Sequence, residues 1–134
     1  MKRKLKEKIM TQKWYTLSHQ WLRVLGEIAV VGMSAYVVRR LNGVKKVHLP
    51  QKGSAVRAGG KIGMLFGKRT ACVFFCPVSG IVLEVNEKAL QKPQIVDENP
   101  EKEGWLFKLR MTKVNDMIPL LSKEQYARVV SFES

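Results

Sequence analysis

Short runs of β-branched and apolar residues, separated by Gly, Pro and Asn, dominate the sequence from Trp14 onward. Runs of this length between turn-forming residues are typical of strands rather than of long helices. The chain has 134 residues, of which 46% are hydrophobic. That is enough apolar material for one domain with a buried core. We therefore expect a mainly β fold, a small sandwich or barrel formed by residues 14–134.

Turn residues divide the expected strands into two hairpins and three further strands. The first hairpin pairs residues 21–24 with 28–33 across Gly26-Glu27. The second pairs residues 61–66 with 70–75 across Gly67-Lys68-Arg69. The remaining strands are expected at residues 44–49, 81–85 and 105–111, and a long acidic loop at residues 91–104.

Two helices are expected, a short one in the first half of the chain and one at its C-terminus. Ser34 stands where an N-cap would precede residues 35–41, and Asn42-Gly43 is a stop signal. Beyond Ser122 the apolar residues recur at helical spacing. Residues 1–13 are basic and lack the apolar segment of a secretory signal. We expect them to be a tail and the protein to be cytoplasmic, with a mitochondrial location left open.

The net charge of +13 is unevenly distributed along the chain. Residues 28–83 contain nine Lys and Arg but no Asp or Glu. Such a block attracts polyanions or an acidic protein partner. Nucleic-acid binding is the weaker hypothesis, because Phe66, Phe74 and Phe75 lie among apolar residues rather than among bases. We expect these three side chains to belong to the core.

Residue types that perform catalysis or bind metals are few and dispersed. His19, His48, Cys72 and Cys76 form no tight pairing, and Cys72-x3-Cys76 is only half of a four-ligand zinc site. No nucleophilic triad, phosphate-binding loop or dinucleotide fingerprint is present. No apolar run approaches the roughly 20 residues that span a membrane. We therefore expect no enzyme, no metal site and no membrane segment, and two cysteines that pack in the core.

Several segments, taken in order, resemble the signature motifs of glycine cleavage system H proteins. Residues 15–21, YTLSHQW, resemble the family's Y-T-x-S-H-E-W, and residues 26–34, GEIAVVGMS, resemble G-x-x-A-x-V-G-I-T. Residues 76–80, CPVSG, and 104–108, GWLFK, resemble A-P-V-S-G and G-W-L-F-K. Such matches continue from about Tyr15 to Tyr126, so together they are far more specific than any one of them.

The resemblance implies a barrel-sandwich hybrid, two packed antiparallel sheets with a lipoyl lysine at the tip of a hairpin. Such a protein is a carrier without an active site of its own. Its covalent lipoic acid, added by a lipoate-attaching enzyme, takes an aminomethyl group from glycine decarboxylase to the aminomethyltransferase. Dihydrolipoamide dehydrogenase then reoxidises the arm. In this fold His19 is expected to be structural, and Trp21 and Trp105 to be core or sheet-face aromatics.

The hairpin tip departs from the family pattern at the acceptor position. The family places its lysine in an E-S-V-K-A setting, where this chain has Phe66-Gly67-Lys68-Arg69-Thr70. Arg69 occupies the lysine's place, and a guanidinium cannot supply the neutral amine that lipoylation requires. Lys68, one residue earlier, is the candidate lipoyl attachment site. We expect Gly67 to adopt a backbone conformation closed to other residues and thereby to present Lys68.

Two functions are compatible with this departure. In the first, the chain is an H-protein-like carrier lipoylated at Lys68. In the second, it is a non-lipoylated, repurposed H-like binding module that recruits an acidic protein. Phe66 replaces the family's acidic residue, and the chain is basic in a family whose members are acidic. Both differences predict altered surfaces on its partners.

Overall fold

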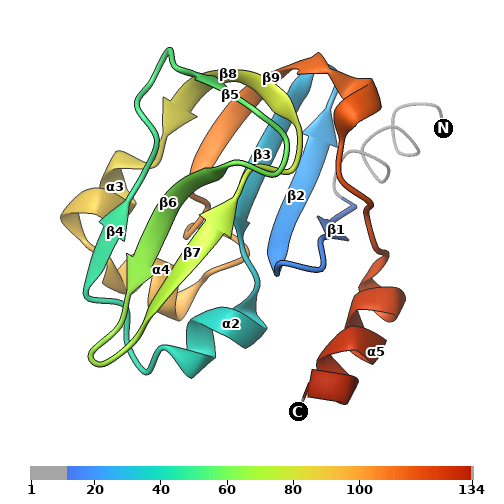
Figure 1. Ribbon diagram of the computed structural model, residues 1–134. Helices are drawn as coiled ribbons and strands as arrows, with labels where there is room; N and C mark the ends of the chain where they lie inside the picture. Colours follow the sequence, from blue (N-terminus) through green and yellow to red (C-terminus); the bar gives the residue numbers. More distant parts are fainter. Residues whose placement is uncertain (1–11, 134) are drawn as a thin grey trace, which may run out of the picture.

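The computed structural model describes residues 12–133, which form two antiparallel sheets packed face to face (Figure 1). The larger sheet has the strand order β1 (Trp14–Tyr15), β2 (Gln20–Leu25), β3 (Ile28–Met33), β9 (Phe107–Lys113), β8 (Ser79–Val85), β5 (Ala55–Val56). The smaller sheet has the order β4 (Lys46–His48), β6 (Lys61–Phe66), β7 (Ala71–Phe75). The mainly β fold with two packed sheets is confirmed, although the described strands do not close into a barrel. The basic tail expected at residues 1–13 lies almost entirely outside the described residues.

The main core lies between the two sheets. Leu22 and Leu109 of the larger sheet and Leu65 and Phe74 of the smaller one are fully buried there. The rings of Phe74 and Phe107 stack across the interface, with centroids 6.1 Å apart. These contacts fix the β6–β7 hairpin against the rest of the molecule, because burying each such side chain contributes about 1.5–3 kcal/mol.

A second cluster lies on the opposite face of the six-stranded sheet, over β1 to β3. Because side chains alternate along β2, Leu22 faces the main core while Trp21 faces this cluster. Trp21 packs with Tyr15 and Tyr126, whose rings stack at 4.5 Å. The indole N–H of Trp21 donates to the Pro100 carbonyl at 2.9 Å, so this polar group is satisfied despite its burial.

Both predicted hairpins and both predicted helices are present. Gly26 has φ +60°, a left-handed conformation suited to the turn between β2 and β3. The Ser34 hydroxyl accepts the Val37 N–H at 3.4 Å and caps α2 (Ala35–Arg40). Asn42 and the glycine after it both have positive φ and end that segment. The C-terminal helix is α5 (Lys123–Glu133).

The prediction of a long loop at residues 91–104 is wrong. The chain forms α4 (Gln94–Glu98) within this stretch and α3 (Glu87–Gln91) immediately before it. Ala89 of α3 and Val96 of α4 are fully buried, so each helix is held by one apolar anchor within a polar sequence. Pro93 separates them, and its fixed φ suits the start of α4.

Candidate functional site

The tip of the β6–β7 hairpin consists of residues 67–70. The Gly67 N–H donates to the Thr70 carbonyl at 2.8 Å, which leaves Lys68 and Arg69 as the two central residues of the turn. Both side chains are exposed. Within residues 12–133 no hydrogen bond or ion pair engages the Lys68 ammonium. The structure therefore presents two neighbouring cations, of which only Lys68 can become a nucleophilic amine.

The expectation that Gly67 adopts a backbone conformation closed to other residues is wrong. Its φ is not in the left-handed region, which among the described glycines is adopted by Gly26, Gly43, Gly53 and Gly59. A Cβ on Gly67 would lie 2.4 Å from the carbonyl oxygen of Leu41. Glycine is needed because the tip packs directly against the backbone at the end of α2. The tip is therefore anchored rather than rearranged.

Two adjoining hollows lead away from the tip along α2. The first, about 420 Å³, lies beside Lys68, and the second, about 390 Å³, reaches His19. Both are bordered by Arg40, Leu41 and Thr70. The surface next to the tip is therefore concave, with space for a flexible group attached there.

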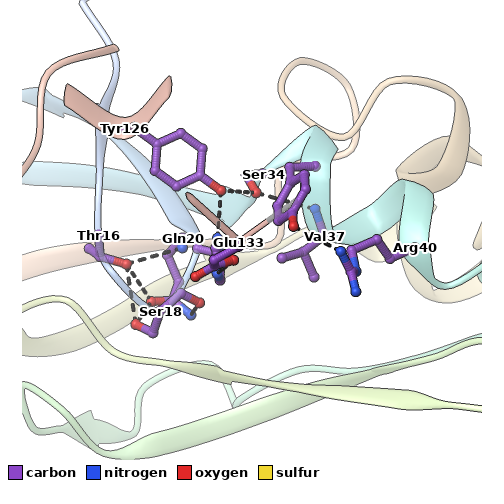
Figure 2. Close-up of polar contacts among 10 residues, drawn as sticks. Thr16, Ser18, Gln20, Ser34, Val37, Arg40, Tyr126 and Glu133 are labelled. Carbon is purple, nitrogen blue, oxygen red and sulfur yellow. Dashed lines mark hydrogen bonds and ion pairs between the residues drawn. The ribbon is translucent and has the colours of Figure 1, made fainter. Parts of the chain in front are cut away.

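The far end of these hollows is a hydrogen-bonded network centred on Tyr126 (Figure 2). The Tyr126 hydroxyl lies 2.6 Å from the Ser34 hydroxyl and 2.7 Å from Nδ1 of His19. His19 Nε2 lies 3.1 Å from a Glu133 carboxylate oxygen. Burial raises the pKa of Tyr126 to about 12, an effect that the nearby Glu101 and Glu133 carboxylates reinforce. These contacts tie α5 to the sheet, which is the structural role expected for His19.

Gln20 is a further residue of this region, and its role was not predicted from the sequence. It stands where the family motif has Glu, and it is fully buried. Its carbonyl oxygen accepts the hydroxyls of Thr16 and Ser18, and its amide donates to the Ser18 carbonyl at 2.9 Å (Figure 2). The neutral amide is therefore satisfied without a charge. Comparison of residues 15–21 with the family motif Y-T-x-S-H-E-W could have identified the position of Gln20 as one with a specific role.

The two cysteines have structural surroundings. Cys72 on β7 packs against the main core, and Cys76 is fully buried with its thiol directed at the Val78 carbonyl, 3.0 Å away. Burial raises the pKa of Cys76 to about 11 and also raises that of Cys72. No group of three or more potential metal ligands occurs among residues 12–133. Both thiols are protonated at neutral pH and are poor nucleophiles.

A separate cavity of about 900 Å³ lies beside Trp105, near α3 and α4. Its buried polar residue, Asn86, donates to the Glu103 and Trp105 carbonyls at 2.8 and 2.7 Å. The ammonium of Lys108 lies over the Trp105 ring at 4.8 Å. The cavity therefore shows no unsatisfied buried polar group that would select a ligand. Within the described part of the chain, no helix is long and apolar enough to cross a membrane.

A two-sheet domain with an exposed lysine at an anchored hairpin tip has the arrangement of a small carrier domain. The sequence profile described as "Glycine cleavage H-protein" matches residues 13–133. The chain is 35% identical to the probable glycine cleavage system H protein 1 of Saccharolobus solfataricus over 88% of each chain. It is 40% identical to the H protein of Rubrobacter xylanophilus over 85% of this chain and 88% of that one.

A solved structure leads to the same family. The crystal structure of a glycine cleavage system H protein from Mycobacterium marinum superposes with a TM-score of 0.80 at 28% identity, covering 87% of this chain and 94% of that one. The chain belongs to the glycine cleavage H-protein family. Members of this family are lipoic acid carriers of the glycine cleavage system and are not enzymes.

Proposed function

We propose that this protein carries an aminomethyl group in glycine cleavage on a lipoyl arm attached to Lys68. The observation that carries the proposal is the placement of Lys68 at the centre of the hairpin tip, exposed and without a described partner. Arg69 beside it occupies the family's acceptor position but stays protonated. The exposed lysine and the adjoining hollows therefore fit a covalently attached lipoyl group.

Attachment requires Lys68 to act once as a nucleophile. Its deprotonated amine attacks the carbonyl of a lipoyl adenylate, the new C–N bond forms, AMP leaves, and the nitrogen loses a proton. Once attached, the lipoyl group supplies the sulfur chemistry that accepts and releases the aminomethyl group.

The partners in this proposal are glycine decarboxylase, the aminomethyltransferase, dihydrolipoamide dehydrogenase and a lipoate-attaching enzyme. A tethered arm serves several enzymes because attachment raises its effective concentration at each of them. We place the protein in the cytoplasm, in keeping with its archaeal and bacterial relatives, although a relative in Schizosaccharomyces pombe is named as mitochondrial. The non-lipoylated module is not favoured by the family membership, and nucleic-acid binding remains the weakest alternative.

Lipoylation in vitro tests the proposal. The wild-type chain is incubated with lipoate, ATP and a lipoate-protein ligase, and its intact mass and peptide map are measured. We expect one added lipoyl amide, about 188 Da, on Lys68. The variant Lys68→Arg keeps the charge but removes the amine, so it should gain nothing.

The double variant Lys68→Arg/Arg69→Lys is the matched control, because it moves the single lysine to the family's position. Modification of this double variant shows that the ligase accepts the tip. If the double variant is lipoylated while the wild type is not, the carrier function at Lys68 is overturned. Modification that persists in Lys68→Arg would equally overturn the assignment of the residue.

A further inference from the structure

The three-stranded sheet has one buried face and one open face. Leu65 and Phe74 point into the main core, but their neighbours along β6 and β7 do not. Four half-buried apolar side chains belong to neither core cluster, and we call them the apolar face: Met64, Phe66, Val73 and Phe75. No described helix lies in front of β6 and β7 (Figure 1). The expectation that Phe66 and Phe75 belong to the core is therefore wrong.

Basic residues border the apolar face. Phe66 pairs across the strands with Lys46, whose ammonium lies 6.0 Å from the ring centroid. His48 meets the same ring edge-on at 5.1 Å. Exposed cations surround this surface on the same strands and at their turns, and we call them the cationic rim: Lys45, Lys46, Lys61, Lys68 and Arg69. No Asp or Glu occurs on these strands or on the connections between them.

The strand β7 also leaves an open edge. Its only neighbour among the described strands is β6, so one side of its backbone is unpaired within this sheet. Ala71–Phe75 contains no charged residue. Exposed edges are normally protected by charge, proline or a bulge, and an apolar one favours association with another chain. The edge and the apolar face thus expose the same strand to a partner.

We propose that the apolar face and the cationic rim dock a partner protein whose contact surface is an apolar patch surrounded by Asp and Glu. This proposal rests on the carrier function above, since the rim includes Lys68 and a partner seated there lies next to the attachment point. Carboxylates opposite the rim would meet no like charge within residues 28–83. A second copy of this chain would instead place cations against cations.

The shape of the surface favours a protein over a lipid membrane. The side chains of the apolar face are half-buried between their neighbours, so they do not project as membrane-inserting groups must. The large apolar side chains that do project are scattered over other elements: Leu17, Leu25, Leu90, Val114 and Phe132. A sheet face with an apolar centre and a charged rim has the anatomy of a protein interface.

Binding measurements with the enzymes that act on the tip test the proposal. Purified glycine decarboxylase, aminomethyltransferase, dihydrolipoamide dehydrogenase and lipoate ligase from the organism that encodes this chain are titrated into the 15N-labelled full chain. We expect at least one to bind, with amide shifts concentrated on β4, β6 and β7. Lys46→Glu and Val73→Asp should each weaken binding by about tenfold or more, and added salt should weaken the wild-type complex.

Val114→Asp is the matched control, because Val114 is 60% exposed and lies on the turn after β9. It introduces the same polarity and charge as Val73→Asp and should leave binding unchanged. Lys46→Glu alters an exposed side chain, so it keeps the test valid if Val73→Asp fails to fold. Loss of lipoylation in Lys68→Arg reports on the carrier function, whereas weakened binding of Lys46→Glu and Val73→Asp reports on docking, so the two proposals fail separately.

The proposal would be overturned if none of the four enzymes bound the wild-type chain, or if the shifts mapped to other strands. It would also be overturned if sedimentation revealed a dimer that Val73→Asp dissociates, because a second copy would then occupy the face. Binding of phosphatidylglycerol vesicles or of a DNA duplex to the wild type, lost in both Lys46→Glu and Val73→Asp, would overturn it as well.

Discussion

The two sheets of this protein differ in what covers their outer faces. The six-stranded sheet has the main core on one side and the cluster of Tyr15, Trp21 and Tyr126 on the other. The three-stranded sheet has the same core on one side but no described element on the other. The uncovered sheet lies wholly within the stretch that lacks acidic residues. The open sheet is therefore the one on which we propose that a partner docks.

The largest effect on stability is expected when substitutions on the two faces of β7 are compared. Phe74→Ala removes a fully buried ring from the core and should lower the free energy of unfolding by about 3–5 kcal/mol. Phe75→Ala, one residue later, removes a ring from the apolar face and should cost about 1 kcal/mol or less. Urea denaturation of both variants checks this. Equal losses would mean that the outer face is covered after all.

The next largest effect concerns the tip of the open sheet, which rests on the end of α2. Gly67→Ala places a Cβ against the Leu41 carbonyl oxygen and should destabilise the protein by about 1–3 kcal/mol. Gly53→Ala is a useful reference, since a Cβ there meets nothing and only its positive φ is strained. Thermal unfolding of the two variants separates close contact from backbone strain. A fully stable Gly67→Ala protein would contradict the anchored tip.

Tyr126→Phe tests the contacts that hold α5 against the six-stranded sheet. It removes the contacts with Ser34 and His19, and we expect a loss of about 1–2 kcal/mol near neutral pH. The pKa of Tyr126 is about 12 in the fold, above the ordinary value of about 10. The folded state therefore holds this proton more tightly than the unfolded one. The stabilisation is complete below about pH 10 and is lost as the pH rises toward 12.

Denaturation of wild type and Tyr126→Phe over this pH range checks the sign. The stability difference between them should shrink as the pH rises, because only the wild type can lose this proton. Tyr36→Phe serves as a control, since it removes an exposed hydroxyl that accepts from Arg40. A difference that grows with pH would contradict the raised pKa.

The smallest effect is expected on the open face. Lys46→Gln removes a cation positioned over the Phe66 ring and should change stability by about 0.5 kcal/mol. The same variant should measurably weaken partner binding. Small stability effects together with large binding effects would distinguish the open sheet from the covered one. A loss of several kcal/mol would instead make Lys46 a structural residue.

The hairpins, the Ser34 cap and the position of the tip could be predicted because each depends on local turn chemistry or on a motif. The two helices in residues 87–98 could not, since single buried anchors such as Val96 leave no periodic pattern. The exposure of the outer face of β7 could not be predicted from the sequence either. Val73, Phe74 and Phe75 form a continuous apolar run, and such a run does not reveal which of its two faces is covered.

The contact between Gly67 and Leu41 has a consequence for any group attached at the tip. Because the turn rests on the backbone at the end of α2, its motion relative to the body of the molecule is restricted. A group on Lys68 would then pivot about a fixed point, and its reach would be set by its own rotatable bonds and those of the lysine. The volume it sweeps becomes a property of the arm alone. Its effective concentration at a docked enzyme is therefore determined by how the enzyme is seated rather than by hairpin motion.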